Sequence, residues 1–357
     1  MIRERMTIAA AFRFASARTA NRLVAGVPAV ARLARAYARV SANAPLVVVL
    51  GDGGELSPLA HAETMRLAPG LAVIVHEGER RGAIPGETLP DPAAITALLA
   101  AAAPVLPPPA DPVAALDQAA RKILRATAKP GDGIVARHLN RPVSQAASAL
   151  LLRFAWVRPG HATALTAAIA LAMLACLLTG TLAGLVAGAV LFQLASIADG
   201  IDGEIARATF RTSARGAAWD SGVDAATNLG FLAGVIANLW LRGQVAPATI
   251  GLVGLGILAL GMMLLGLQAR ARGEPLHFDG AKRLLGNRES ALTRWLRYVT
   301  MRDFYCLFLA VMIALGQVAA ALTIFTVAAA AWLVTVIALL GRRRAVARDT
   351  SAKDAPA

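Results

Sequence analysis

Four aspartates at regular spacing are the residues of this 357-residue chain that are best suited to chemistry. Asp199 and Asp202 are three residues apart, and Asp220 and Asp224 are four apart, so each pair shares one face of a helix. A short basic turn separates the two predicted helices, which we expect to be antiparallel neighbours with converging carboxylates. Carboxylate oxygens in this number suit Mg²⁺ or Mn²⁺, and such ions bridge phosphate oxygens. The pattern therefore predicts a metal site that acts on a phosphate compound. A cluster of acids that merely pairs with the arginines of the turn does not require this spacing.

The composition indicates that these aspartates belong to a membrane protein. Hydrophobic residues make up 57% of the chain, charged residues make up 16%, and the mean hydropathy is +0.58. A soluble domain carries about 25% charged residues. We expect the net charge of +14 to face anionic lipid headgroups and not nucleic acid. Cys176 and Cys306 lie in apolar runs, which argues against a disulfide scaffold and a cysteine-based zinc site.

Six apolar stretches after about residue 160 approach the length of about 20 residues that a bilayer requires. The predicted spans are residues 162–180, 182–206, 217–241, 247–268, 300–316 and 318–340. Basic residues gather after the second, fourth and sixth spans, whereas the alternate connections hold only Arg242. By the positive-inside rule both termini are cytoplasmic, and we expect a multi-pass protein of the inner (cytoplasmic) membrane. No signal peptide is expected after Met1.

The first 160 residues lack apolar stretches of this length and instead show alternating helix and strand patterns. A helix that begins near Pro28, a strand over 45–50, a helical stretch and a strand over 71–75 indicate a small α/β unit. A proline-rich linker and an amphipathic stretch precede the first span. We expect four segments: an α/β domain (1–110), a linker and amphipathic juxtamembrane segment (111–160), a six-helix domain (161–341) and a basic cytoplasmic tail (342–357).

The aspartate motif resembles the signature of the CDP-alcohol phosphotransferase (CDP-alcohol phosphatidyltransferase) family at every defined position. It reads Asp-x2-Asp-Gly-x2-Ala-Arg-x8-Gly-x3-Asp-x3-Asp from Asp199 to Asp224. The resemblance covers about residues 160–340. It implies a mainly α integral membrane protein with six transmembrane helices around a cytoplasm-facing polar cavity, usually as a homodimer. The implied reaction moves the phosphoryl-alcohol group of a CDP-alcohol donor to a hydroxyl acceptor, and CMP leaves.

The same resemblance implies a role for each motif residue. One or two Mg²⁺ or Mn²⁺ ions would be held by Asp199, Asp202, Asp220 and Asp224, with Asp220 bridging the ions if there are two. Asp224 would also be the base that deprotonates the acceptor hydroxyl. The residues implied to accommodate or contact the cytidine diphosphate are Gly203, Ala206, Arg207 and Gly216.

Basic and polar residues outside the carboxylate set are candidates for contacts with the acceptor or its phosphate. They are Lys129, Arg137, Arg141, Thr163, Arg215 and Arg302. Arg302 and Asp303 stand at the head of the fifth predicted span, where they either line the acceptor pocket or form a capping ion pair. We expect His161 to be an interfacial residue and not a ligand.

Residues 24–52 resemble the helix-and-strand part of a nucleotidyltransferase domain, as found in the inositol-phosphate cytidylyltransferase/di-inositol-phosphate synthase group. Active domains of this kind need a glycine-rich turn with Arg and Lys for the triphosphate, but residues 9–24 contain neither Gly nor Lys. The run from Gly51 to Gly54 is typical of a strand-to-helix turn. We therefore expect a degenerate domain with a structural or regulatory role.

Three functions follow from these observations. The first is transfer from CDP-diacylglycerol to a polyol phosphate such as inositol phosphate or glycerol phosphate, in phospholipid biosynthesis. The second is a CDP-inositol-using synthase, alone or bifunctional with a cytidylyltransferase. The third is a non-catalytic lipid-binding or transport protein, but transport predicts acids along a path or in repeated halves. The acids here cluster on one pair of helices, which favours chemistry.

Overall fold

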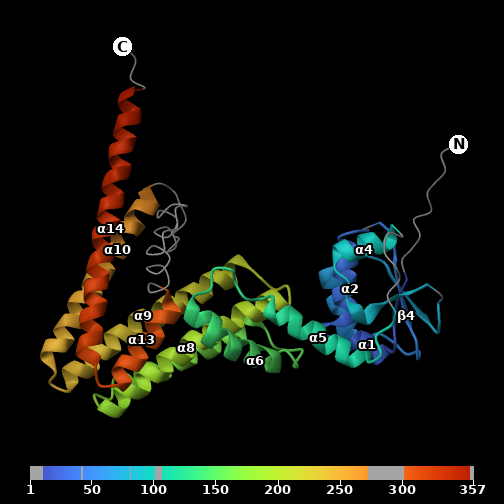
Figure 1. Cartoon of the computed structure of the whole chain (residues 1–357), viewed down its shortest axis with the longest axis horizontal. Coiled ribbons are helices and arrows are strands. Elements are labelled where there is room, and N and C mark those ends of the chain that lie inside the picture. Colours follow the sequence, from blue (N-terminus) through green and yellow to red (C-terminus); the bar gives the residue numbers. More distant parts are fainter. Residues whose placement is uncertain (1–10, 42, 81, 101–106, 272–300, 354–357) are drawn as a thin grey trace. The chain divides into compact units, whose positions relative to one another are not determined.

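The computed structural model describes residues 11–41, 43–80, 82–100, 107–271 and 301–353 (Figure 1). The side chains of residues 269, 271 and 339–353 are outside the description, as is the predicted basic connection over 272–300. The chain divides into two compact units. The sheet unit comprises Met1–Pro130, Val143–His161 and Ile201–Gly216, and the helical unit comprises Gly131–Pro142, Ala162–Gly200 and Ala217–Ala357.

A four-stranded parallel sheet with the order β5-β4-β1-β6 forms the centre of the sheet unit. The strands are β1 (Ala11–Phe14), β4 (Leu46–Leu50), β5 (Val73–Glu77) and β6 (Ile84–Pro85). β4 is buried along its whole length, as a run of branched apolar residues in a parallel sheet requires. The predicted α/β unit is confirmed, but its second strand begins two residues later than expected. β1 is an additional strand ahead of the predicted helix.

Helices and a short hairpin surround this sheet (Figure 1). The helices are α1 (Ala17–Asn21), α2 (Ala29–Ala38), α3 (Pro58–Leu67), α4 (Pro92–Leu99) and α5 (Pro112–Arg125), with the 3₁₀ turn η1 (Gly86–Thr88). Strands β2 (Leu23–Val24) and β3 (Val27–Pro28) form the hairpin. On α2, Val30, Leu33 and Tyr37 are almost fully buried because helical spacing brings them to one face. The Tyr37 ring lies edge-on to Phe12 of β1 at 6.1 Å, which joins α2 to the sheet.

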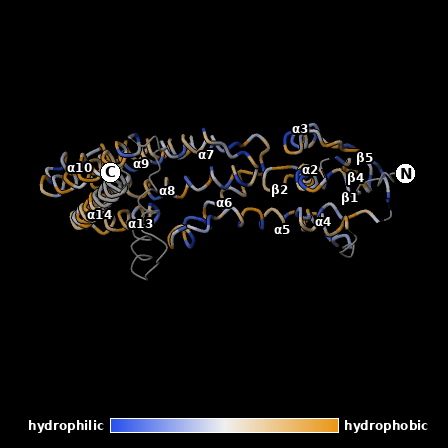
Figure 2. The backbone as a smooth tube through the Cα atoms, turned by 90° about the horizontal axis from the view of Figure 1, so that it is seen from above, coloured by the Kyte–Doolittle hydropathy of each residue, from blue (hydrophilic) through white to orange (hydrophobic). Residues whose placement is uncertain are grey.

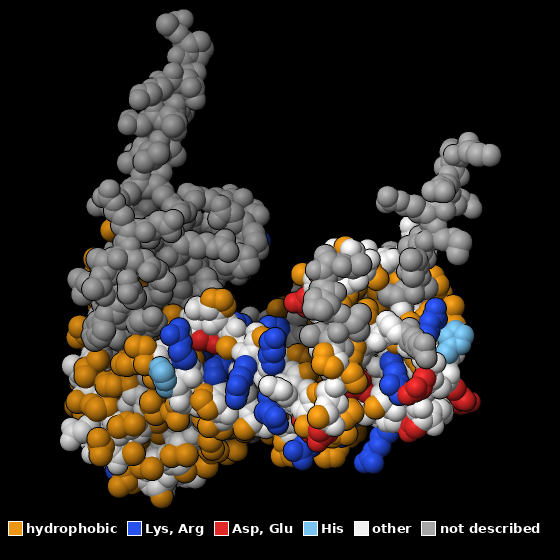
Figure 3. Space-filling view, turned by 45° about the vertical axis from the view of Figure 1, so that its right-hand side comes forward, with side chains coloured by type: hydrophobic (Ala, Val, Ile, Leu, Met, Phe, Trp, Pro, Cys, Tyr) orange, Lys and Arg blue, Asp and Glu red, His pale blue; other side chains and the backbone are white. Residues whose placement is uncertain are grey.

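Long apolar helices make up most of the helical unit. They are α7 (Pro159–Leu177), α8 (Leu182–Ala208), α9 (Ala214–Leu241), α10 (Val245–Ala271), α13 (Arg302–Ala314) and α14 (Val318–Lys353). The π-helix η2 (Ala136–Asn140) precedes them in this unit, whereas most of α6 (Arg141–Leu151) and the end of α8 belong to the sheet unit. Figure 2 shows hydrophobic residues along most of α10, and Figure 3 shows hydrophobic side chains over much of the visible described surface of this unit. A mainly α membrane protein with a small α/β part is therefore confirmed.

Five of the six predicted spans correspond, within the described residues, to helices long and apolar enough to cross a bilayer. These helices are α7, α8, α9, α10 and α14. The predicted span over 300–316 corresponds to α13, which has 13 residues. At about 1.5 Å per residue such a helix extends about 20 Å, less than the bilayer core. Its start follows the extended backbone of Met301, and it ends just before Gly316, whose φ is +74°.

Small residues allow close helix contacts inside the helical unit. Phe192 of α8 stacks on Phe231 of α9 with ring centroids 3.8 Å apart, which places these two helices side by side. Leu177 of α7 is fully buried and fills the space above Gly234 of α9. A Cβ at Gly234 would lie 2.7 Å from Leu177 Cδ1, whereas a Cβ at Gly230 would meet nothing within 4 Å.

We predict that Gly234→Ala destabilises the folded protein, because overpacking against Leu177 costs about 1–3 kcal/mol. Gly230→Ala is the matched control on the same helix, and alanine should be neutral or stabilising there because it favours helix by about 1 kcal/mol over glycine. The measurement is thermal unfolding of the full chain in detergent. Equal melting temperatures for the two variants would contradict the close α7–α9 packing.

Candidate active site

The two helices predicted to carry the aspartates are present. Asp199 and Asp202 lie on α8, and Asp220 and Asp224 lie on α9. α8 ends in a tight turn in which the Arg211 amide donates to the Ala206 carbonyl at 2.8 Å, while Phe210 adopts a φ of +57°. This is the geometry of a Schellman cap, with phenylalanine at the position that usually holds glycine.

Arg302 of α13 brings Asp199 and Asp224 together. Its Nη1 lies 2.9 Å from Asp199 Oδ1 and 2.5 Å from Asp224 Oδ1. Asn228, one turn after Asp224 on α9, donates from Nδ2 to Asp224 Oδ1 at 3.2 Å. A single cationic nitrogen therefore lies between carboxylates from two neighbouring helices. Since these carboxylates are only 28% and 35% exposed, the positive charge offsets the cost of their partial burial.

The remaining two aspartates lie three and four residues from Asp199 and Asp224 along the same helices. Asp202 follows Asp199 on α8 and is 6% exposed, whereas Asp220 precedes Asp224 on α9 and is half-buried. Within the described part of the chain, no group of three or more His, Cys, Asp or Glu side chains is arranged to hold a metal ion. The four-carboxylate site thus stays a prediction, and the observed pair is Asp199 with Asp224.

The observed donors nevertheless fit a divalent cation. Two carboxylate oxygens from two helices contact one positively charged nitrogen, so their positions already favour a cation at that point. Carboxylate oxygens are also the hard ligands that Mg²⁺ and Mn²⁺ prefer.

The residues implied to contact the nucleotide lie at the end of α8 and the start of α9. The Arg207 side chain covers Gly203, because a Cβ at Gly203 would lie 2.9 Å from Arg207 Nη1. Arg207 Nε also donates to the Thr127 carbonyl at 2.9 Å. Gly216 is exposed, and its amide donates to Ser213 Oγ at 3.0 Å. The room expected at Gly203 is therefore occupied by an arginine that is itself an implied diphosphate contact.

The candidates for acceptor contacts are divided between the two units, with Lys129 and Arg215 in the sheet unit and the other four in the helical unit. Arg141 forms a two-point ion pair with Asp132, at 2.8 and 3.1 Å. Arg137 is exposed and lies 3.4 Å from the Asp132 carbonyl. Lys129 and Arg215 are exposed, and Thr163 is half-buried. Of the six candidates, Arg302 is the one that contacts the motif aspartates in the ion pairs described above.

Asp303 has a capping function that differs from that of its neighbour Arg302. Its Oδ2 accepts the Ala136 amide at 2.6 Å, at the start of η2. Gly133 permits this approach, because a Cβ there would lie 2.6 Å from the same oxygen. The two alternatives for Arg302 and Asp303 were an acceptor pocket and a capping ion pair. Asp303 caps a helix start, but its partner is the Ala136 amide and not a cation.

Glu204 is a structurally important carboxylate that sequence reasoning missed. It is fully buried inside the motif, where Ser144 Oγ and Ser148 Oγ of α6 donate to its two oxygens at 2.6 and 2.7 Å. The signal was two serines four residues apart on an amphipathic helix together with an acid in an apolar stretch. These bonds fix α6 against the end of α8.

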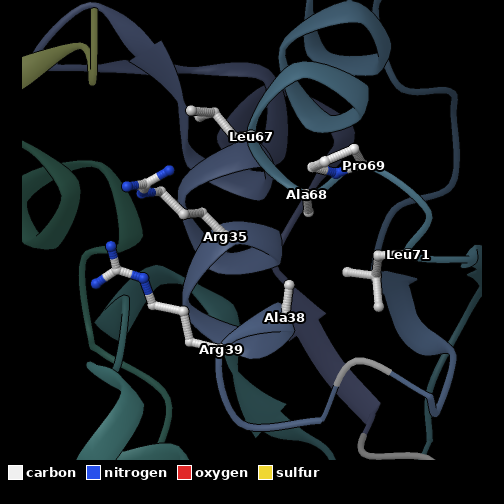
Figure 4. A pocket seen from close by; sticks show the side chains of 7 residues that line it. All are labelled: Arg35, Ala38, Arg39, Leu67, Ala68, Pro69 and Leu71. Carbon is white, nitrogen blue, oxygen red and sulfur yellow. The ribbon is translucent and has the colours of Figure 1, made fainter. Parts of the chain in front are cut away.

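A cavity of about 250 Å³ lies elsewhere in the sheet unit (Figure 4). It is lined by Arg35, Ala38, Arg39, Leu67, Ala68, Pro69 and Leu71. These residues belong to α2, to α3 and to the chain that follows α3, so the cavity contains none of the motif residues.

We predict that Glu204→Ala, Ser144→Ala and Ser148→Ala each lower the stability of the full chain in detergent. Hydrogen bonds to a charged group contribute about 1.5–3 kcal/mol each. A thermal-unfolding cycle with the Ser148→Ala and Glu204→Ala variants should show non-additive losses, because each variant removes the same bond. Strictly additive losses would contradict the pairing.

Comparison with known proteins places the aspartate motif in its family. A family model described as CDP-alcohol phosphatidyltransferase matches residues 156–337, which is more than half of the chain. A protein of Thermococcus kodakarensis named "Bifunctional IPC transferase and DIPP synthase" is 42% identical over 119 residues, covering 33% of this chain and 26% of the relative. Proteins of the same name from Aquifex aeolicus and Archaeoglobus fulgidus are each 38% identical, over 116 and 125 residues, covering 30% and 34% of this chain.

The chain spans about a quarter of the length of these curated relatives (26%, 24% and 24%). The family match includes all of α8 and α9, and hence the four aspartates and the glycines between them. The chain belongs to the CDP-alcohol phosphatidyltransferase family.

Proposed function

We propose that this protein transfers the phosphoryl-alcohol group of a CDP-alcohol to the hydroxyl group of an acceptor, with release of CMP. The observation that carries the proposal is the convergence of Asp199 and Asp224 on one cationic point, within a motif that belongs to the family. Family membership supports a CDP-alcohol donor and a hydroxyl acceptor, and the apolar helices support action at a bilayer.

The roles follow from the chemistry of the side chains. Asp199, Asp202, Asp220 and Asp224 would hold one or two Mg²⁺ or Mn²⁺ ions. A divalent ion, when bound, supplies neutralisation of the diphosphate charge so that a hydroxyl oxygen can approach phosphorus. Arg207 is suited to contact the diphosphate of the donor. Asp224 accepts the proton of the acceptor hydroxyl as its oxygen attacks, and Asn228 orients that carboxylate through its hydrogen bond.

For the donor, we propose CDP-diacylglycerol, with a polyol phosphate such as inositol phosphate or glycerol phosphate as acceptor. Donor tails in the bilayer fit a site on apolar helices, and the basic residues supply charge for an acceptor phosphate. The relatives are named as bifunctional IPC transferase and DIPP synthase, and their matched regions are 38–42% identical to this chain. These names favour a second candidate, a CDP-inositol-using synthase.

We also propose a location and an arrangement of segments. Arg207, Arg211 and Arg215 around the α8–α9 turn support a cytoplasmic active site, with both termini cytoplasmic in the inner membrane. The family resemblance supports a homodimer. In the sheet unit, Asp52 Oδ1 accepts the Ala17 amide at 3.2 Å, so this carboxylate supports a turn of the fold. Because residues 9–24 also contain neither Gly nor Lys, we propose a degenerate domain over 1–110 without cytidylyltransferase activity.

The test supplies the purified full chain with radiolabelled CDP-diacylglycerol or CDP-inositol and a panel of acceptors, and measures CMP release. Asp224→Asn should slow turnover about 10²–10⁴-fold, as expected for loss of a general base, while donor binding stays near wild type. Glu79→Gln, at an exposed carboxylate of the sheet unit, is the matched control and should be fully active. A wild-type protein that binds these donors but never releases CMP is a non-catalytic lipid-binding protein, and the proposal is then wrong.

Arg302→Ala tests the metal site without measuring turnover. Removal of the guanidinium leaves Asp199 and Asp224 without their cation, so Mg²⁺ should raise the melting temperature of this variant more than that of the wild type. A ligand at 100 times its dissociation constant contributes about 2.7 kcal/mol of stability. The double variant Arg302→Ala/Asp199→Asn should lose most of the gain. Identical Mg²⁺ responses of all three proteins would exclude a metal at this pair.

A further inference from the structure

Arg32 of α2 is a buried arginine whose described hydrogen bonds all go to backbone carbonyls. It is 8% exposed, and it donates from Nε to the Val24 carbonyl at 2.6 Å and from Nη2 to the Ala25 carbonyl at 2.9 Å. Nη2 also donates to the Ala208 carbonyl at 2.6 Å. Ala208 is the last residue of α8, so one guanidinium joins the β2–β3 hairpin to the end of the motif helix.

Arg66 and Glu63 of α3 bind the next residues of the same turn. Arg66 Nη2 donates to the Thr209 carbonyl at 2.9 Å, and Nη1 lies 3.4 Å from the Phe210 carbonyl. Glu63 accepts from Arg66 at 2.6 Å through one oxygen and from Arg211 at 2.5 Å through the other. Every residue from 208 to 211 therefore contacts the sheet-bearing part of the same unit.

These contacts satisfy the groups that a helix end leaves without partners. The last carbonyls of a helix have no intrahelical donor, and they carry the negative end of the helix dipole. Cationic guanidinium groups supply both the donors and the opposite charge. The end of α8 is thus capped by arginines that come from a region more than 140 residues earlier in the chain.

Phe210 shows that the turn is held in one conformation. Its φ of +57° is unfavourable for a residue with a side chain, and such backbone persists where its surroundings determine it. The Arg35 guanidinium lies 4.1 Å from the centroid of the Phe210 ring, and that of Arg32 lies 5.3 Å from it. Arg35 projects from the same side of α2 as Arg39 (Figure 4).

The positive charges of Arg32 and Arg35 also need the contacts with residues 208–211. Burial, followed by the neighbouring Arg35, lowers the pKa of Arg32 to about 9. Burial and the charges of Arg39 and Arg66 lower the pKa of Arg35. The carbonyls of residues 208–210, the Phe210 ring and Glu63 are what offset this crowding of positive charge.

We propose that Arg32, Arg35, Glu63 and Arg66, here called the turn clamp, position the donor-binding half of the catalytic motif. The inference rests on the proposed function. The clamped turn belongs to the same compact unit as Asp202, Gly203, Ala206, Arg207 and Gly216. The sheet domain thereby gains a specific role, which is to hold these residues in register for the cytidine diphosphate. The four residues of the turn clamp are positioning residues, since they act through the turn and not on the substrate.

The test compares Arg66→Ala with Arg39→Gln in the full chain. Arg66→Ala removes the bonds to the Thr209 and Phe210 carbonyls, whereas Arg39 is exposed and belongs to the same basic group outside the clamp. The first readout is amide hydrogen exchange over residues 209–216, which should become faster in Arg66→Ala and stay unchanged in Arg39→Gln. Arg32→Gln is the second clamp variant, and Arg66→Lys should recover part of the protection because it keeps a cation.

The second readout is affinity for CDP in the presence of Mg²⁺, together with the KM values of both substrates. Misplacement of catalytic groups by about 1 Å can cost about 10²-fold, so we expect CDP affinity to fall and the donor KM to rise by about 10-fold. The acceptor KM should change less than the donor KM, because only one of the six candidates for acceptor contacts, Arg215, lies in the segment 209–216. A merely structural role would lower the amount of folded enzyme and leave the donor KM unchanged.

The possible results separate the two proposals. An active wild type whose Arg66→Ala and Arg32→Gln variants keep normal exchange, or normal donor KM despite faster exchange, overturns the turn clamp and leaves the transferase function standing. A wild type that binds CDP without turnover overturns the transferase function. In that case, weaker CDP binding by Arg66→Ala and Arg32→Gln than by the wild type supports the turn clamp, and equal binding overturns it. A wild type that neither binds CDP nor releases CMP overturns both.

Discussion

Negative charge at the edge of an apolar helix bundle requires a positive partner, and this requirement organises the helical unit. Asp199 and Asp224 are partly buried, and Arg302 lies between them within 2.9 Å of both. Two buried amides of the bundle also find hydrogen-bond partners. Asn140 accepts from Gln193 at 3.0 Å and donates to Ser196 at 3.3 Å. Asn238 donates to the carbonyl of Leu177, the last residue of α7, and to that of Thr181 in the connection to α8. A position that already accommodates a cation between two carboxylates is chemically suited to a divalent ion that binds a diphosphate.

In the sheet unit, buried positive charges are paired with the partial negative charges of backbone carbonyls. Here the negative groups are the free carbonyls at the end of α8, and Arg32 and Arg66 provide the positive partners. A cation at a helix C-terminus contributes about 0.3–1 kcal/mol when exposed and up to about 2 kcal/mol when partly buried. The arginines donate hydrogen bonds to the carbonyls, so without this contact both the guanidinium groups and the carbonyls would lack these partners. The sheet-bearing part of the unit thus caps the helix that carries the motif.

The parts of the structure that sequence could predict are those determined by local spacing. The aspartates at i, i+3 and i, i+4 predicted the motif helices, and the run of branched residues predicted β4. β1 was missed because a four-residue segment with Arg13 at its centre lacks a strand signal, and α13 is short because an extended Met301 and a left-handed Gly316 bound it. Pairs between distant residues carry no such signal. The contacts of Arg302 with Asp199, of Ser148 with Glu204 and of Arg32 with Ala208 join segments separated by 56 to 176 residues, and only the folded chain brings them together.

α8 is the element in which these two charge arrangements meet. Asp199 belongs to the helical unit, whereas Asp202, Gly203 and Arg207 follow on the same uninterrupted helix and belong to the sheet unit. An α-helix turns about 100° per residue, so within the sheet unit the directions of Asp202, Gly203 and Arg207 depend on the rotation of this end of α8 about its axis. Arg207 on Thr127, Glu204 on the α6 serines and Arg32 on Ala208 each oppose such a rotation. Within the sheet unit, the motif residues at this end of α8 therefore have a defined geometry, because side chains and carbonyls of the same unit hold the helix end.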